Sequence, residues 1–182
     1  MKLNSFSLVE IIIWCGMIVI LFFLLSKPVL DLIDQTCLIQ EAQAVTQDIE
    51  LVRSLSQLQS EKLKMEWFGS QNRYRFETSQ GGMGKVGQFI ERNFNSKIGF
   101  PYYFSISSVS YIDENGTTKT GSINFGTTSS DSYGTLVFDS TGTPNQGGHV
   151  VLMIRNTKRA LAVIVKPVTG RARIGKVHFI HP

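Results

Sequence analysis

The chain has 182 residues, a length that fits one compact domain with an additional segment and argues against two full enzyme domains. Hydrophobic residues make up 42% of the chain and charged residues 18%, so it is too apolar for a disordered protein and too poor in charge for a long coiled coil. Its 2 cysteines and 3 histidines exclude a four-cysteine zinc site and a disulfide scaffold, and its formal net charge is +4.

The N-terminal part of the chain is the most apolar. Residues Ile11–Leu25 carry no charge, and from Phe6 onward only Ser7 and Glu10 interrupt the apolar run. As a helix this stretch would be about 30 Å long, which is enough to cross the hydrocarbon core of a bilayer. We therefore predict a single membrane-spanning helix over residues 6–28.

Two other kinds of N-terminal segment share part of this pattern. A cleaved secretory signal would use Lys2 as its basic region and Ala42-Gln43-Ala44 as its cleavage site, but that site lies far downstream of the apolar run. A plain single-pass anchor fits every residue except Glu10, because an unpaired carboxylate is costly to bury in lipid. Glu10 therefore needs a partner or a route to the membrane interface.

The residues around Glu10 form a specific motif. Ser5-Phe6-Ser7-Leu8-Val9-Glu10, followed by Ile11-Ile12-Ile13, resembles the type IV prepilin motif, in which a short basic leader is cut before a Phe and a Glu follows four residues later. The resemblance implies that residues 1–5 are a leader, that prepilin peptidase cuts between Ser5 and Phe6, and that the new amine of Phe6 is methylated. Ser5 stands where the family usually has Gly.

The same resemblance gives Glu10 a role in assembly, since the corresponding Glu of pilin-like filaments pairs with the N-terminal amine of a neighbouring subunit. Phe6 and Glu10 are one helical turn apart and share a face. The implied partners are prepilin peptidase, other pilins or pseudopilins in a filament, and the bacterial inner membrane. The chain would cross that membrane once, with its C-terminal domain on the extracytoplasmic side.

Residues 29–60 continue the helix with an amphipathic pattern. The apolar positions Leu38, Ala42, Val45, Ile49 and Val52 are separated by steps of four and three, while Gln40, Gln43, Gln47, Glu50 and Arg53 occupy the opposite face. We predict one helix from about Phe6 to about Leu58, which Pro28 can kink or break. Packing of the apolar stripe on a sheet is the favoured use of this pattern, and a coiled-coil partner is the alternative.

Residues 61–182 are predicted to form a β-rich domain. Short runs of β-branched and aromatic residues alternate there with turn signals. The expected strands are Arg73–Thr78, Tyr102–Ile112, Thr120–Phe125, Thr135–Asp139, Val150–Arg155, Leu161–Lys166 and Arg171–Phe179. Glu114-Asn115-Gly116 and Asn156-Thr157-Lys158 are predicted hairpin turns. A long helix packed on these strands is an α+β fold of pilin-like type.

Several C-terminal segments resemble the GspH/FimT group of minor pseudopilins. They are Thr135–Pro144, the Val150–Arg155 and Leu161–Lys166 hairpin, and Thr169–Ile174. The resemblance implies a structural subunit near the tip of a type II secretion pseudopilus or a type IV pilus. Some DNA-uptake members use a Gly-Arg-x-Arg segment on DNA, and this chain has such a segment at Gly170–Arg173.

The basic charge is concentrated at the C-terminal end. Residues 140–182 contain seven Lys or Arg and no Asp or Glu, whereas residues 1–139 contain eleven basic and fourteen acidic residues. In an extended segment Arg171 and Arg173 would point to one side, roughly 6.6 Å apart, a distance that approaches the spacing of phosphates along one strand. Side chains that could widen this patch are those of Lys158, Arg159, Lys166 and Lys176. The asymmetry indicates an anionic partner, which could be DNA, lipid headgroups or an acidic neighbouring subunit.

No residue pattern in the chain indicates catalysis, a cofactor or a metal. His178 and His181 would point to opposite faces of an extended chain end, and no acidic residue follows Asp139 to complete a site. We expect no enzyme activity. Three functions remain open: a pilus or pseudopilus subunit, a DNA-binding minor pilin, and a single-pass envelope protein outside any filament.

Overall fold

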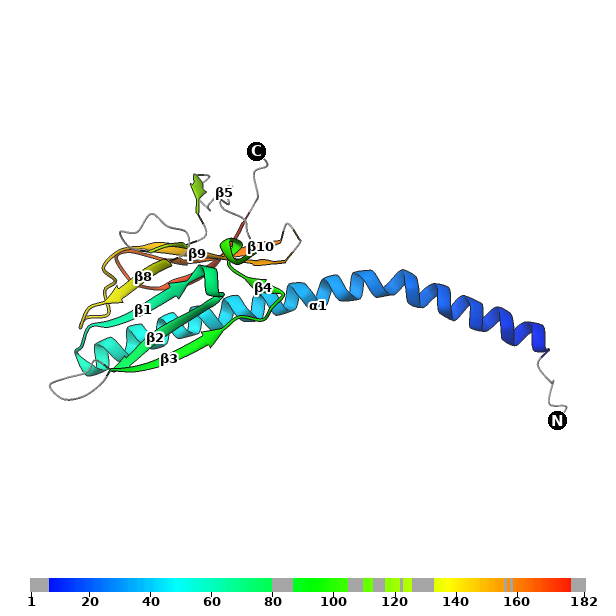
Figure 1. Ribbon diagram of the computed structural model, residues 1–182, viewed down its shortest axis with the longest axis horizontal. Helices are drawn as coiled ribbons and strands as arrows, with labels where there is room; N and C mark the ends of the chain where they lie inside the picture. Colours follow the sequence, from blue (N-terminus) through cyan, green and yellow to red (C-terminus); the bar gives the residue numbers. More distant parts are fainter. Residues whose placement is uncertain are drawn as a thin grey trace. The chain divides into compact units, whose positions relative to one another are not determined.

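The computed structural model describes residues 7–79, 87–104, 110–112, 117–121, 123–125, 133–155, 157 and 159–177, which form one long helix and a set of short antiparallel strands (Figure 1). In chain order the elements are α1 (Leu8–Gln59), β1 (Leu63–Phe68), the 3-10 turn η1 (Gly69–Gln71), β2 (Arg73–Ser79), β3 (Gln88–Asn93), β4 (Ile98–Gly99), the 3-10 turn η2 (Pro101–Phe104), β5 (Ser110–Ile112), β6 (Thr118–Thr120), β7 (Ile123–Asn124), β8 (Tyr133–Phe138), β9 (Gly148–Ile154), β10 (Ala160–Val165) and β11 (Ala172–Lys176). The fold is therefore α+β, as the sequence predicts.

The chain divides into two units, Met1–Thr36 and Cys37–Pro182, and α1 belongs to both. In the first unit none of the side chains of residues 7–36 is buried within the chain, although most of them are apolar. By length and composition α1 can cross a membrane, and in lipid a helix satisfies its own backbone hydrogen bonds. Pro28 lies inside α1, so it does not end the helix.

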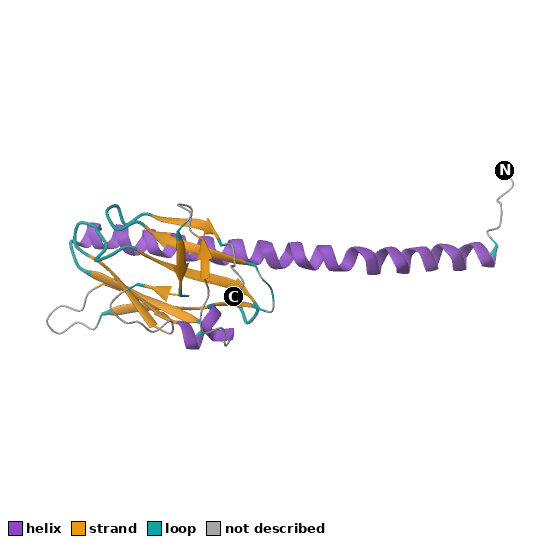
Figure 2. Ribbon diagram, turned by 90° about the horizontal axis from the view of Figure 1, so that it is seen from above, coloured by secondary structure: helices purple, strands orange, loops and turns teal. Residues whose placement is uncertain are grey.

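In the second unit, the apolar stripe of α1 forms part of the core. Its positions Leu38, Ala42, Val45, Ile49 and Val52 are all buried, which confirms the predicted amphipathic face. The opposite positions Gln40, Gln43 and Gln47 are exposed. Figure 2 shows this part of α1 lying along the strands, so the stripe packs on sheets.

Two larger sheets contribute the rest of the core. The first has the strand order β3-β2-β1-β8, and the second has the order β11-β10-β9-β4, with β7 also paired to β9. In the first sheet Met65 lies opposite both Phe76 and Leu136, and in the second Val163 lies opposite Val150. Strands β5 and β6 form a separate two-stranded sheet.

Helix α1 joins the outer strands of these two sheets. Asp48 forms an ion pair with Arg92 of β3, with 3.3 Å between Oδ2 and Nε. Glu50 lies two residues further along the helix, and its Oε1 accepts a hydrogen bond of 2.9 Å from the backbone N–H of Ala172 in β11. On the other side, the backbone N–H of Thr135 in β8 donates to the carbonyl of Phe125, next to β7. The two sheets and the helix thus surround one core.

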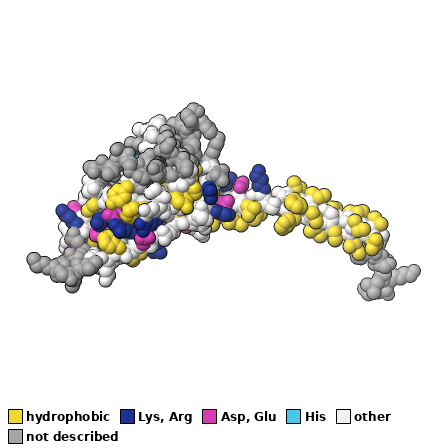
Figure 3. Space-filling model, viewed as in Figure 1, with side chains coloured by type: hydrophobic (Ala, Val, Ile, Leu, Met, Phe, Trp, Pro, Cys, Tyr) yellow, Lys and Arg dark blue, Asp and Glu magenta, His cyan; other side chains and the backbone are white. Residues whose placement is uncertain are grey.

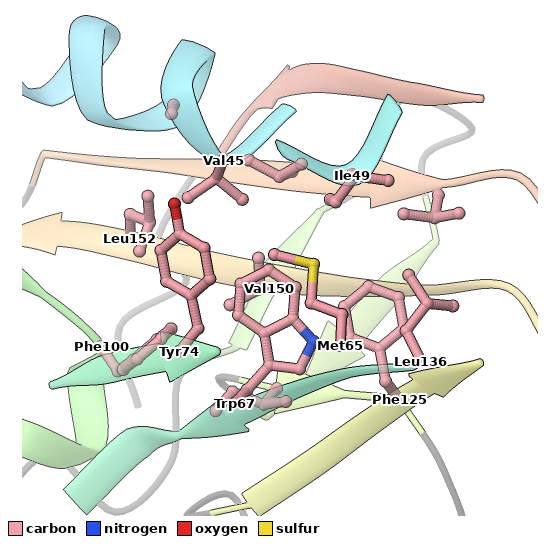
Figure 4. Close-up of a cluster of buried hydrophobic side chains, with 14 of the residues drawn as sticks. Val45, Ile49, Met65, Trp67, Tyr74, Phe100, Phe125, Leu136, Val150 and Leu152 are labelled. Atoms are coloured by element: carbon pink, nitrogen blue, oxygen red, sulfur yellow. The ribbon is translucent and has the colours of Figure 1, made fainter. Parts of the chain in front are cut away.

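Aromatic rings fill the centre of that core (Figure 4). Trp67 stacks on Phe125 with 5.7 Å between ring centroids and meets Tyr74 at 5.2 Å. Val45 and Ile49 of α1 approach this cluster from the helix side, opposite the strands that carry Trp67 and Tyr74. Burial of these large side chains is the main source of stability for the C-terminal unit.

Five predicted strands are confirmed and two are corrected. The confirmed strands lie in β2, β8, β9, β10 and β11, and the predicted end of the last one, residues 178–179, lies outside the described residues. The prediction of one strand over Tyr102–Ile112 is wrong at its start, where Pro101–Phe104 forms a 3-10 turn because proline fixes φ and suits the first position of a helical turn. The prediction over Thr120–Phe125 is also wrong, since Gly121 has φ of 108° and separates β6 from β7. Strands β1, β3 and β4 were not predicted.

Both predicted hairpins have the expected strand pairing. Strands β5 and β6 pair antiparallel with Ile112 opposite Thr118, and the predicted turn residues 114–116 lie outside the described residues. Strands β9 and β10 pair antiparallel with Met153 opposite Ala160, which puts Thr157 at the tip.

Candidate anion-binding cleft

The predicted basic residues lie in and around the connection between β10 and β11. Lys166 follows β10, Gly170 and Arg171 precede β11, and Arg173 lies in β11. Arg159 precedes β10 at the opposite end of that strand. Lys158 lies outside the described residues, as does the side chain of Lys176.

A tight turn fixes the Gly170–Arg173 segment. The backbone N–H of Gly170 donates to the carbonyl of Lys166 at 2.9 Å, and the N–H of Lys166 donates to the carbonyl of Arg171 at 3.1 Å. Gly170 has φ of +64°, and a Cβ at this position would lie 2.9 Å from the carbonyl oxygen of Gly142. Glycine is therefore required both by the backbone conformation and by the close approach of a second loop.

That second loop is Asp139–Thr143, between β8 and β9. Asp139 Oδ1 accepts hydrogen bonds from the Thr141 hydroxyl at 2.6 Å, from the Thr141 N–H at 2.8 Å and from the Thr143 N–H at 2.9 Å. These bonds, led by that of the Thr141 side chain, lower the pKa of Asp139 below its ordinary value. The loop is thus held in one conformation by its own carboxylate.

Helix α1 holds both loops. Gln57 Nε2 donates to the carbonyl of Thr141 at 2.8 Å, and Glu50 Oε1 accepts from the N–H of Ala172 at 2.9 Å. The second oxygen of Glu50 pairs with Arg53 Nη1 at 3.1 Å. Glu50 and Arg53, which the sequence places on the polar face of the helix, are therefore half-buried against β11.

These three segments enclose a cleft with a volume of about 540 Å³. Four basic residues line it, namely Arg53, Lys166, Arg171 and Arg173. Thr141, Thr143 and Thr169 line it as well, and no Asp or Glu is among the described residues of the lining. The structure thus brings Lys166, Arg171 and Arg173 together and leaves Arg159 outside the cleft.

Arg53 is the cleft residue that sequence reasoning missed. Its position on the helix indicated a solvated face, and no local pattern links it to residues of β11. Positive side chains that converge with hydroxyl groups can bind an oxyanion through charge-assisted hydrogen bonds.

The predicted processing and assembly residues lie at the other end of α1. Glu10 lies in its first turn, where its N–H donates to the carbonyl of Ser7 at 3.0 Å and its side chain is exposed. Ser5 and Phe6 lie outside the described residues.

A second polar cluster covers the outer face of the first sheet. Figure 3 shows basic and acidic side chains next to one another over β1, β2 and β3. Glu66, which is 6% exposed, pairs with Arg75 and accepts a hydrogen bond from the Tyr133 hydroxyl at 3.0 Å. Burial alone would raise the pKa of Glu66, but the hydrogen bonds from Arg75 and Tyr133 bring it below its ordinary value. These pairs neutralise one another, so the face offers less charge than the cleft.

No family model, no curated protein and no solved structure matches the chain. A long N-terminal apolar helix whose second half packs on β-sheets is compatible with a pilin-like fold. Within the described residues, no group of three His, Cys, Asp or Glu side chains could hold a metal ion.

Proposed function

We propose that the chain is a minor pilin or pseudopilin of the GspH/FimT type, a structural subunit near the tip of a type II secretion pseudopilus or a type IV pilus. The observation that carries this proposal is the division of α1. Its first part is apolar and unburied within the chain, whereas its second part supplies one side of the core of a β-sheet domain. A filament subunit needs such a helix, because its apolar half can lie in the membrane before assembly and against other subunits after it.

The motif Ser5-Phe6 with Glu10 supports the same proposal. Prepilin peptidase would remove residues 1–5, and the chain would stay in the inner membrane through α1, with its C-terminal unit on the extracytoplasmic side. An unpaired Glu10 carboxylate is costly in lipid, so pairing with a neighbour's N-terminal amine would favour assembly.

The test is mass spectrometry of the mature protein purified from its own cell envelope. We expect a chain that begins at N-methylated Phe6, and deletion of the prepilin peptidase should leave the chain uncut. A mature chain that still begins at Met1, or one that begins near Val45, would contradict the proposal and favour a plain envelope anchor or a secreted protein.

DNA binding is a second candidate function, favoured by the position of Arg171 and Arg173 in one cleft. Both guanidinium groups could contact backbone phosphates, a mode of binding that is insensitive to sequence and weakened by salt. The test is a mobility shift with the full chain in non-ionic detergent. The double variant Arg171→Ala with Arg173→Ala should abolish the shift of single- and double-stranded DNA, and absence of a shift with the wild-type chain at low salt would exclude this function.

A further inference from the structure

The basic residues that line the cleft come from three separate segments of the chain. Arg53 comes from α1, Lys166 from the end of β10, and Arg171 and Arg173 from the start of β11. Arg155 and Arg159, which would extend the charge along the sheet, do not line the cleft. A strand of nucleic acid requires cations at successive phosphates, whereas basic residues grouped around one cleft suit one compact and highly charged group.

We propose that this cleft is a binding site for a phosphate monoester group. The four basic residues of the lining exceed the two nearby carboxylates, Glu50 and Asp139. Glu50 is already paired with Arg53, and Asp139 accepts hydrogen bonds from its own loop. A monoester is a dianion above its second pKa of about 6, so it matches this excess better than a carboxylate or a phosphodiester, each of which has one charge. Arginine forks are suitable donors to its oxygens, and Thr169 adds a hydroxyl group to the lining.

The volume of the cleft also bears on the size of the ligand. At about 540 Å³ it is much larger than one phosphate group, so it has room for the molecule that carries the phosphate. Thr141 and Thr169 lie on different loops, and each loop is fixed by its own hydrogen bonds. The site is thus ordered before a ligand arrives, which reduces the entropy lost on binding.

The charged groups at the cleft are Glu50 and Arg53 from α1, Asp139 from the β8–β9 loop, and Lys166, Arg171 and Arg173 from the β10–β11 region. None of them is a histidine. Between about pH 5 and pH 7.5, the main change of charge at the site is therefore the second ionisation of the ligand.

The experiment is isothermal titration calorimetry of the full chain in non-ionic detergent, with methyl phosphate and dimethyl phosphate as a matched pair. At about pH 7.5 we expect methyl phosphate to bind at least about tenfold more tightly than the diester. Its affinity should fall by about tenfold at about pH 5, since most of the ligand then has one charge. Equal affinities for the two esters, a pH-independent affinity, or no binding of methyl phosphate would overturn the proposal.

Two single variants distinguish binding in the cleft from a general effect of basic charge on binding. Arg171→Ala should weaken methyl phosphate binding by at least about tenfold, because Arg171 lines the cleft. Arg155→Ala removes the same charge from an exposed position outside the cleft and should change the affinity by less than about twofold. An equal loss in both variants would mean that binding follows net charge, and circular dichroism checks that both variants fold.

This inference does not depend on filament assembly, so failure of the processing test would leave it intact. It shares residues with the DNA candidate, and one oligonucleotide with either a 5′-phosphate or a 5′-hydroxyl distinguishes the two. A preference for the 5′-phosphate form supports the monoester site, whereas equal binding of both forms supports backbone contacts and counts against it.

Discussion

Asp48 is a buried carboxylate next to the apolar stripe of α1. It is 7% exposed, accepts a hydrogen bond of 2.7 Å from the Tyr74 hydroxyl and pairs with Arg92. A buried charge is tolerated only when its partners satisfy it. Burial and the bond to Asp48 raise the pKa of Tyr74, so the phenol remains a donor. These contacts fix the position of α1 along β2 and β3.

Removal of the Tyr74 hydroxyl should therefore destabilise the C-terminal unit. We expect Tyr74→Phe to lower the free energy of unfolding by about 1–3 kcal/mol, because Asp48 keeps Arg92 but loses its other donor. Tyr133→Phe is a matched control, since Glu66 keeps its ion pairs with Arg75 and Lys64 when that hydroxyl is removed. Denaturant unfolding measures the free energy of unfolding of both variants. An equal or larger loss of stability in Tyr133→Phe would contradict the role assigned to Asp48.

Gly170 is the second residue whose replacement should have a clear effect. Gly170→Ala should cost about 1–3 kcal/mol of stability, since alanine is strained at φ of +64° and its Cβ would press on the carbonyl of Gly142. Gly16→Ala is the control, because a Cβ there meets nothing within 4 Å and alanine favours a helix. Thermal unfolding compares the two, and a neutral Gly170→Ala would mean that the two loops can separate without loss.

Glu66 should make stability depend on pH in a defined direction. Its pKa in the folded chain lies below the ordinary value, so its stabilising contribution is present above about 4.5 and is lost as the pH falls through the folded value. The difference in stability between wild type and Glu66→Gln should be largest near neutral pH and should shrink below about pH 4.5. The pKa shift of Glu77 has the opposite sign, because burial raises this pKa. The difference in stability between wild type and Glu77→Gln should therefore not shrink at low pH in this way.

Among the elements, α1 has two parts of different character in one continuous helix. Its residues 7–36 bury nothing within the chain, whereas Leu38, Ala42 and Val45 belong to the core of the second unit. The helix is held in its second half by tertiary packing, and its first half has the composition of a membrane span. The two halves should therefore respond differently to deletion.

A fragment of residues 37–182 should be soluble and folded, since it keeps the whole apolar stripe. A fragment of residues 60–182 should fail to fold, because the sheets would lose Val45, Ile49 and Val52 from one side of their core. Size-exclusion chromatography and circular dichroism measure both outcomes. Aggregation of the longer fragment would show that the first half of α1 is needed by the domain itself.

At the scale of the whole molecule, the filament contact that we propose should depend on Glu10. The variant Glu10→Val should insert into the membrane at least as well as wild type, because it removes the one charge in the apolar run. It should nevertheless fail to enter filaments or to crosslink to other pilins. Crosslinking in isolated membranes measures this, and normal assembly of Glu10→Val would exclude pairing with a neighbour's amine.

Most of the elements that local patterns predicted have either an alternation of buried and less buried positions or a short apolar run. The stripe from Leu38 to Val52 and strand β8 have this property, whereas β9 and β10 are short apolar runs rich in β-branched residues and are buried at most positions. Strand β1 was missed although Leu63, Met65 and Trp67 alternate with Lys64 and Glu66, since Leu, Lys, Met and Glu favour helices when taken singly. Strand β3 was missed because all its side chains are exposed, so it has no alternation to detect.

The sequence by itself determined the long apolar helix, its amphipathic continuation, the β-rich domain and the concentration of basic residues near the C-terminus. Each of these features can be predicted from residues that are close in sequence, because helical and strand periodicity are local properties of the chain. Only the tertiary structure decided that Arg53 joins Lys166, Arg171 and Arg173 in one cleft, and that Glu50 holds the first residue of β11. Such contacts join segments from opposite ends of the chain, and they arise when the helix closes the space between the outer strands of two sheets.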